Sequence, residues 1–111
     1  MLPDLLAAAR AVQPRTVALR RALHRQPEIG LSLPRTRDAV VAELADLPLR
    51  VHLGSGVSSV VAVLDGARPG PTVLLRGDMD ALPVQEDTDL PFASRVDGAM
   101  HACGHDTHTA M

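Results

Sequence analysis

The chain has 111 residues, the size of one small domain or of part of a larger one, and its hydrophobic residues (46%) include a single aromatic side chain, Phe92. A core must therefore come from Leu, Val, Ala and Ile, which limits how much surface so short a chain can bury. A formal net charge of −2 excludes the basic surface typical of nucleic-acid binding, and the sequence has no apolar run of the roughly 20 residues that span a bilayer, so we expect no nucleic acid and no membrane as partners.

The first predicted element is a helix over residues 2–26. Pro14 lacks the backbone N–H that a helix interior uses, so we expect it to kink or divide this helix. Residues 24–30 should then form a break, and we expect His24 and Glu28 to have a structural role in it. The helical pattern rests on apolar residues at spacings of three and four, namely Leu5, Ala8, Ala9, Val12, Val17, Leu19, Ala22 and Leu23.

A second helix is predicted to begin after residue 32. Ser32 is its expected N-terminal cap, and Pro34 is tolerated in the first turn of a helix. Pro48 should end the helix, because proline cannot continue it. The expected buried face consists of Ala39, Val40, Leu44 and Leu47.

Three short, Val-rich segments follow, and Gly and Pro residues separate them as they separate strands: residues 49–53, 57–64 and 72–75. The third segment has no polar alternation, which is typical of a central strand buried on both faces. A loop to about Gly98 and a further helix from about Met100 complete the pattern. The predicted fold class is therefore α/β, with helices packed on a mostly parallel or mixed sheet that is incomplete in this chain.

The first of two polar clusters directly follows the predicted buried strand, at residues 76–83 (Arg-Gly-Asp-Met-Asp-Ala-Leu-Pro). Sites in open α/β sheets gather at the carboxyl ends of strands. Asp78 and Asp80 point the same way on an extended backbone, and two such carboxylates repel each other unless a cation, a proton or a positive side chain lies nearby. The alternative interpretation is a polar turn with Arg76 as a surface partner.

The second cluster is residues 101–108 (His-Ala-Cys-Gly-His-Asp-Thr-His). A thiolate and an imidazole suit zinc and similar ions, and a neighbouring acid can orient the imidazole. Gly104 lets the backbone bend so that Cys103 and His105 face one ion. Three alternatives remain open: an inert buried thiol, a thiol nucleophile with a histidine base, and a closed structural zinc site. A single cysteine argues against the last of these, excludes an internal disulfide and is typical of a cytoplasmic protein.

The chain resembles the amidohydrolases that cleave N-acyl amino acids, a metallopeptidase family that includes aminoacylases, hippurate hydrolases, related carboxypeptidases and plant auxin-conjugate hydrolases. The resemblance covers about residues 15–111, and the combination of His-Ala-Cys-Gly-His-Asp with Asp-Met-Asp-Ala-Leu-Pro is highly specific. Four stretches carry it: residues 21–30 (Arg-Ala-Leu-His-Arg-Gln-Pro-Glu-Ile-Gly), 76–83, 91–95 (Pro-Phe-Ala-Ser-Arg) and 100–110 (Met-His-Ala-Cys-Gly-His-Asp-Thr-His-Thr-Ala).

This resemblance implies that residues 1–111 are the N-terminal portion of a catalytic domain, without its remainder and without an inserted dimerisation and lid domain. It implies Cys103 and His105 as metal ligands and Asp80 as the acid that orients the ligands or a metal-bridging water. Asp78 sits where more distant relatives place a histidine ligand, so it receives no ligand role. The complete site would hold two divalent ions (zinc, manganese, cobalt or nickel) and would need a Glu-Glu pair and further histidines.

The expected function is metal-dependent hydrolysis of the amide bond of N-acyl amino acids or small peptides, as part of a longer enzyme that forms homodimers or higher oligomers. Two other functions stay open. In the first, the chain is a truncated, inactive remnant that binds at most one metal ion weakly. In the second, it is a soluble interaction module whose Cys103 is a redox-reactive thiol.

Overall fold

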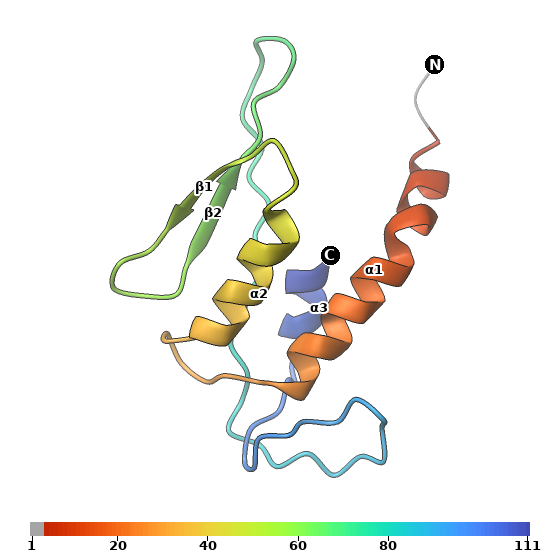
Figure 1. Ribbon diagram of the computed structural model, residues 1–111, viewed down its shortest axis with the longest axis vertical. Coiled ribbons are helices and arrows are strands. Elements are labelled where there is room, and N and C mark those ends of the chain that lie inside the picture. Colours follow the sequence, from red (N-terminus) through yellow and green to blue (C-terminus); the bar gives the residue numbers. More distant parts are fainter. Residues whose placement is uncertain (1–3) are drawn as a thin grey trace.

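The computed structural model describes residues 4–111, which form three helices and a single β-hairpin that lies to one side, next to the second helix (Figure 1). Strands β1 (Arg50–Leu53) and β2 (Val60–Val63) pair antiparallel, with Leu53 opposite Val60. The short third helix packs against the first, and β2 contacts the second. The predicted combination of helices and strands is confirmed. The helices are α1 (Leu5–Arg25), α2 (Pro34–Leu44) and α3 (His105–Ala110).

Helix α1 is continuous over 21 residues, so the expectation that Pro14 divides it is wrong. A proline removes one hydrogen bond from the helical ladder, whereas the turns on both sides keep theirs. Asp4 caps the N-terminus, where its Oδ1 accepts a hydrogen bond from the backbone N–H of Ala7 at 3.0 Å. Residues 2 and 3 of the predicted helix lie outside the described residues.

Helix α2 begins with Pro34 in its first turn, as expected, but Ser32 is not its cap. Leu33 occupies the N-cap position and provides no side-chain hydrogen bond there. Glu28 caps the helix from the preceding loop instead, because its Oε1 accepts hydrogen bonds from the backbone N–H of Thr36 at 2.7 Å and from the Thr36 hydroxyl at 2.8 Å. The helix ends at Leu44, and the chain turns directly after it, so Leu47 lies beyond the helix and is 48% exposed rather than buried.

Residues 72–75 do not form the predicted buried strand. Val73, Leu74 and Leu75 are 79%, 83% and 92% exposed. A buried strand needs neighbours that pair with its backbone and cover its side chains. Within residues 4–111 the only two strands already pair with each other, so this segment has no strand to join.

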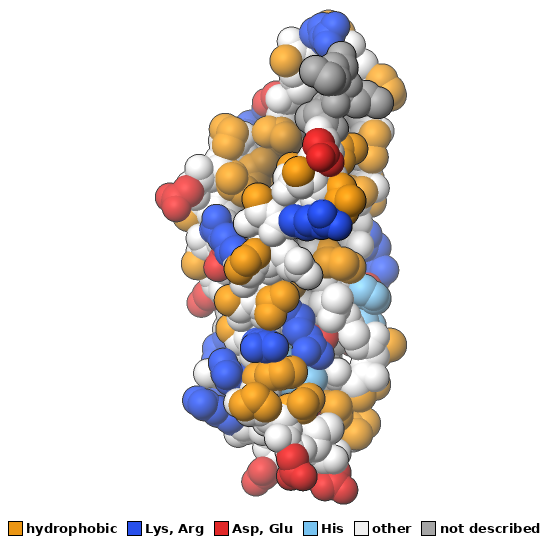
Figure 2. Space-filling model, turned by 90° about the vertical axis from the view of Figure 1, so that its right-hand side faces the viewer, with side chains coloured by type: hydrophobic (Ala, Val, Ile, Leu, Met, Phe, Trp, Pro, Cys, Tyr) orange, Lys and Arg blue, Asp and Glu red, His pale blue; other side chains and the backbone are white. Residues whose placement is uncertain are grey.

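The centre of the structure contains almost as many polar as apolar residues. Its buried apolar residues are Leu23, Pro27, Leu33, Ala81, Phe92 and Ala99, and its buried polar residues are His24, Thr36, Ser58, His101 and Asp106. Since charged side chains are buried only when they are paired, ion pairs and hydrogen bonds must organise this centre. Large apolar side chains such as Leu6 and Val12 stay exposed along α1. Figure 2, which views the molecule from the right-hand side of Figure 1, shows hydrophobic side chains interspersed with arginines on this face. No helix in residues 4–111 is long and apolar enough to cross a membrane.

Candidate metal centre

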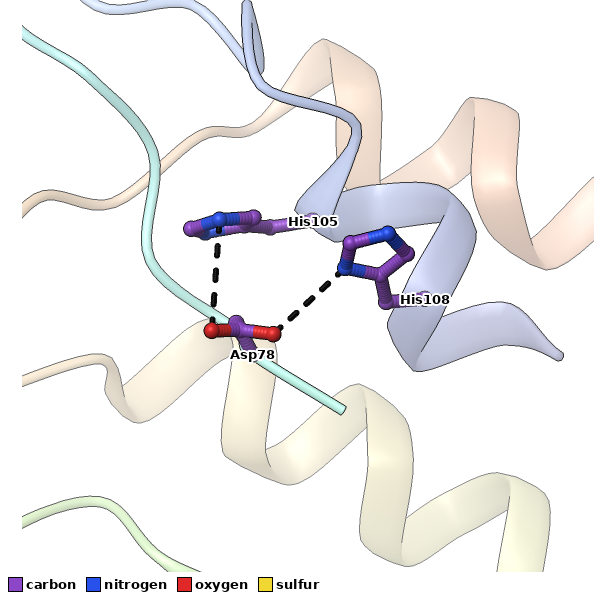
Figure 3. Close-up of side chains that lie close together, drawn as sticks. All are labelled: Asp78, His105 and His108. Carbon is purple, nitrogen blue, oxygen red and sulfur yellow. Dashed lines mark ion pairs between the residues drawn. The ribbon is translucent and has the colours of Figure 1, made fainter. Parts of the chain in front are cut away.

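Two histidines of α3 face one carboxylate of the loop that precedes residue 81 (Figure 3). His105 and His108 are three residues apart and therefore share a face of the helix. His105 Nε2 lies 4.0 Å from Asp78 Oδ2, and His108 Nδ1 lies 3.4 Å from Asp78 Oδ1. One potential ligand atom from each of the three residues lies within 4.8 Å of the others. Below, these three residues are called the donor group.

Asp80 fixes the orientation of the His105 ring. His105 Nδ1 lies 2.8 Å from the backbone oxygen of Asp80 and 3.0 Å from its Oδ1. Both atoms are hydrogen-bond acceptors, so Nδ1 carries the hydrogen and donates it. The neutral ring then has its free lone pair on Nε2, the atom that faces Asp78. A metal-binding histidine is typically held in this way, with its second nitrogen bonded to a carboxylate or a carbonyl.

The loop and α3 lie very close together at Gly77. A Cβ atom at that position would lie 3.1 Å from the backbone oxygen of His108, closer than most side chains tolerate. The hydroxyl of Thr109 donates a hydrogen bond to the backbone oxygen of Asp78 at 2.6 Å. At the start of the helix, Gly104 has a φ of +80°, a conformation that other residues rarely adopt. Glycines on both sides therefore make the donor group possible.

Asp78 is surrounded by positive and hydrogen-bonding groups. Partial burial raises the pKa of its carboxyl, but the charge of Arg76, whose Nη2 lies 3.2 Å away, a backbone hydrogen bond and the two histidines together hold that pKa below its ordinary value of 3.8. Asp78 is therefore ionised at neutral pH. Arg76 is 76% exposed at its side chain, as expected for a surface partner.

The structure brings together only part of the ligand set that the sequence implied. Asp80 and His105 are in direct contact, whereas Cys103 is exposed and is not a member of the donor group. Asp78 and His108 are members, although the sequence reasoning gave neither a ligand role. The sequence signal that could have found His108 is its spacing of three residues from His105, which places both side chains on one face of a helix.

The donor group fits a divalent transition metal by its chemistry. One imidazole with a free Nε2, a second imidazole and an ionised carboxylate form a mixed nitrogen and oxygen set, which zinc, manganese, cobalt and nickel accept. A closed structural zinc site takes four protein ligands, often as paired cysteines. Three grouped donors among the described residues fit an open site better than a closed one.

Residues 74–111 match peptidase family M20/M25/M40. Thermostable carboxypeptidase 1 of Saccharolobus solfataricus is 47% identical over 103 residues, which are 92% of this chain and 26% of that protein. N-acetylcysteine deacetylase of Bacillus subtilis is 43% identical over 110 residues, which are 93% of this chain and 27% of that protein. A crystal structure of another Bacillus subtilis protein, described as a dinuclear metal binding peptidase from the M20 family, matches with a TM-score of 0.84 and 41% identity and covers 91% of this chain and 29% of that one.

The chain thus spans about a quarter of the length of the curated relatives it matches. The specific motifs at residues 76–83 and 100–110 fall inside the part that matches the family. Identity above 40% over most of the chain and the close agreement in fold support the same assignment. Residues 74–111 thus match peptidase family M20/M25/M40, and most of the chain is similar to one segment of relatives named as a carboxypeptidase and a deacetylase.

Proposed function

We propose that this chain contributes part of the metal centre of an amidohydrolase that cleaves the amide bond of N-acyl amino acids or small peptides. The observation that carries the proposal is the double contact of His105 Nδ1 with Asp80, which leaves Nε2 free and directed toward the ionised Asp78. The related carboxypeptidase and the related deacetylase are named for reactions that hydrolyse amide bonds. Their names support the reaction class and leave the acyl group and the amino acid open.

The residues of this chain would have three roles. His105 and Cys103 would bind the metal, and Asp80 would orient His105. A bound divalent ion polarises a carbonyl and lowers the pKa of a bound water from about 15.7 to about 7. Asp78 would favour cation binding by its negative charge. The carboxylate that accepts the proton of the water and the remaining ligands would come from outside residues 1–111.

The finer features of the enzyme belong to the same proposal. Two ions of zinc, manganese, cobalt or nickel would occupy the complete site, and the description of the matched M20 structure as dinuclear supports this number. The enzyme would act in the cytoplasm, where a reducing environment keeps a thiol such as Cys103 available as a ligand. Homodimers or higher oligomers would be its assembled form.

A second candidate function is that of an inactive remnant that binds one ion weakly. The observation that favours it is the small number of grouped donors: Asp78, His105 and His108 form the one such set among residues 4–111. Three donors without further support hold a metal less tightly than a complete site. The two candidates differ in activity, since only the enzyme hydrolyses a substrate.

The test is hydrolysis of N-acetyl amino acids by the complete polypeptide that carries this segment. We expect chelation, Cys103→Ala and His105→Ala each to lower kcat/KM by about a hundredfold or more, because each removes the metal or one of its ligands. Glu43→Gln is the matched control, because Glu43 pairs with Arg15 on the exposed surface between α1 and α2, away from the donor group. Undiminished hydrolysis after all three treatments would refute the enzymatic proposal, and a metal-binding polypeptide without hydrolysis would favour the remnant.

A further inference from the structure

A buried chain of alternating charges joins α1, the loop at residues 83–99 and α3. Arg20 Nε lies 2.8 Å from Asp106 Oδ2, and the same oxygen lies 2.8 Å from His24 Nδ1. His24 Nε2 lies 2.9 Å from Glu86 Oε1. The side chains of Asp106, His24 and Glu86 are 0%, 2% and 2% exposed. Below, these four residues are called the charge chain.

Basic and acidic side chains alternate along the charge chain. Each ring nitrogen of His24 lies within hydrogen-bond distance of a carboxylate oxygen, Nδ1 of Asp106 and Nε2 of Glu86. Two basic side chains thus alternate with two acidic ones. Burying ionisable groups such as Asp106 and Glu86 costs so much desolvation energy that such a network is weak support for stability, and its best-attested use is to specify one geometry.

The geometry that the charge chain would specify is the rotation of α3 about its own axis. This helix has six residues and no side-chain hydrogen bond at its N-cap, and so short a helix is not stable without tertiary contacts. Asp106 lies in its first turn and bonds both to α1 and, through Oδ1, to the backbone N–H of Thr107 at 2.9 Å. Consecutive helical residues are about 100° apart around the axis. With Asp106 turned toward α1, His105 and His108 are turned toward Asp78 and Asp80 on another side of the helix.

We propose that Asp106 is a positioning residue, held by Arg20 and His24, which sets the rotation of α3 and thereby the direction of His105 Nε2. The functional meaning of this inference rests on the proposed metal centre. The positioning of His105 by Asp106 does not depend on the metal centre, because the contact between His105 and Asp80 exists in the chain without a bound ion. Asp106 and the other members of the charge chain are separate from the donor group.

Two variants of different severity test the inference. Asp106→Asn keeps the size of the side chain and removes the charge that pairs with Arg20 and His24. Arg20→Gln is milder, because the Arg20 side chain is 31% exposed, and Arg20→Lys is the conservative variant that should rescue it. Glu28→Gln is the matched control. It makes the same type of change at a carboxylate whose side chain is 9% exposed and which caps α2 without contacting α3.

The first readout is the tautomer of His105 from the nitrogen NMR signals of its ring, with circular dichroism as the check on folding. We expect the Nδ1–H form in the wild-type chain, Glu28→Gln and Arg20→Lys, and a mixture of tautomers in Asp106→Asn and Arg20→Gln. The second readout is Co²⁺ affinity, which should fall about 10- to 100-fold in Asp106→Asn, the range typical for the loss of a group that orients a ligand.

An unchanged His105 tautomer in folded Asp106→Asn and Arg20→Gln would overturn the inference. An equal loss of the Nδ1–H tautomer or of Co²⁺ affinity in the control Glu28→Gln would overturn it too. If Asp106→Asn does not fold, Arg20→Gln decides the question. A complete polypeptide that shows the expected His105 tautomer but binds no Co²⁺ would refute the proposed metal centre and still support the positioning role of Asp106. The two proposals therefore fail in different ways.

Discussion

His105 is bound twice by Asp80, through the side chain and through the backbone of the same residue. The two acceptors lie 3.0 Å and 2.8 Å from His105 Nδ1. Because the backbone acceptor survives any substitution at position 80, removal of the carboxylate should loosen the histidine without releasing it. The effect of such variants should therefore be graded.

We expect Asp80→Ala to lower metal affinity and the kcat of the complete enzyme at least about tenfold, and Asp80→Asn to lower both less. Asparagine keeps an oxygen that accepts the hydrogen of Nδ1, whereas alanine keeps only the backbone acceptor. Co²⁺ titration of the chain and steady-state kinetics of the complete polypeptide measure the two quantities. A loss below about tenfold for Asp80→Ala in both would leave Asp80 as a turn residue.

Cys103 offers a direct spectroscopic test, because a thiolate bound to Co²⁺ gives a charge-transfer absorption that nitrogen and oxygen ligands do not give. We expect this absorption in the wild-type chain and its loss in Cys103→Ser, together with weaker binding. His108→Ala is the informative comparison, since His108 belongs to the donor group and Cys103 does not. If Cys103→Ser binds Co²⁺ with an unchanged spectrum while His108→Ala binds it weakly, the ligand set is that of the donor group.

Gly77→Ala should separate local geometry from overall stability. Its Cβ would lie 3.1 Å from the His108 backbone oxygen and would push the loop with Asp78 away from α3. We expect the Co²⁺ affinity of Gly77→Ala to fall by more than its loss of unfolding free energy alone would explain. Gly66→Ala is the matched control, because its Cβ would meet only an ordinary contact with the Arg68 backbone oxygen at 3.5 Å. Equal affinity in the two variants would show that the close approach at Gly77 is unimportant for the metal centre.

Elements that depend on local sequence could be predicted, whereas contacts between distant residues could not. The hairpin strands were predicted within a few residues, because their Val-rich segments and Gly-containing turn are local features. The resemblance implied that Asp80 orients a metal ligand or a metal-bridging water, and in the structure Asp80 Oδ1 lies 3.0 Å from His105 Nδ1. The cap of α2 was missed, because Glu28 reaches it from a preceding loop and no local pattern predicts such a contact.

The segment at residues 72–75 shows that an apolar run alone does not predict burial. Its apolar run predicted burial on both faces, yet burial depends on neighbouring strands, and the described residues contain none that is free to pair. The charge chain shows the opposite case. Arg20 and His24 are four residues apart on α1, but Glu86 and Asp106 are more distant in sequence, so only the folded structure brings the two acidic side chains to the two basic ones.

The response of the chain to acid follows from two buried carboxylates. Burial raises the pKa of Glu28, but hydrogen bonds from Thr36 and Arg35 and the charge of Arg35 outweigh it and lower that pKa below 4.5. Burial likewise raises the pKa of Glu86, but hydrogen bonds from Ser94, His24 and Thr88 outweigh this effect and lower that pKa below 4.5. The folded chain therefore binds fewer protons at these groups than the unfolded chain near and below pH 4.5.

Since both pKa values are lower in the folded state, these carboxylates stabilise the fold fully above their ordinary value of 4.5, and the stabilisation is lost as the pH falls through the lower, folded values. We expect Glu28→Gln to lower the unfolding free energy at neutral pH by about 0.5–2 kcal/mol, the usual cost of losing a helix cap, and to make its decline in acid shallower. Urea unfolding followed by circular dichroism from neutral pH to about pH 3 measures both effects. Asp46→Asn is the control, because it makes the same type of change at an exposed carboxylate. A decline in Glu28→Gln as steep as in the wild type would show that Glu28 does not contribute to the acid sensitivity of the fold.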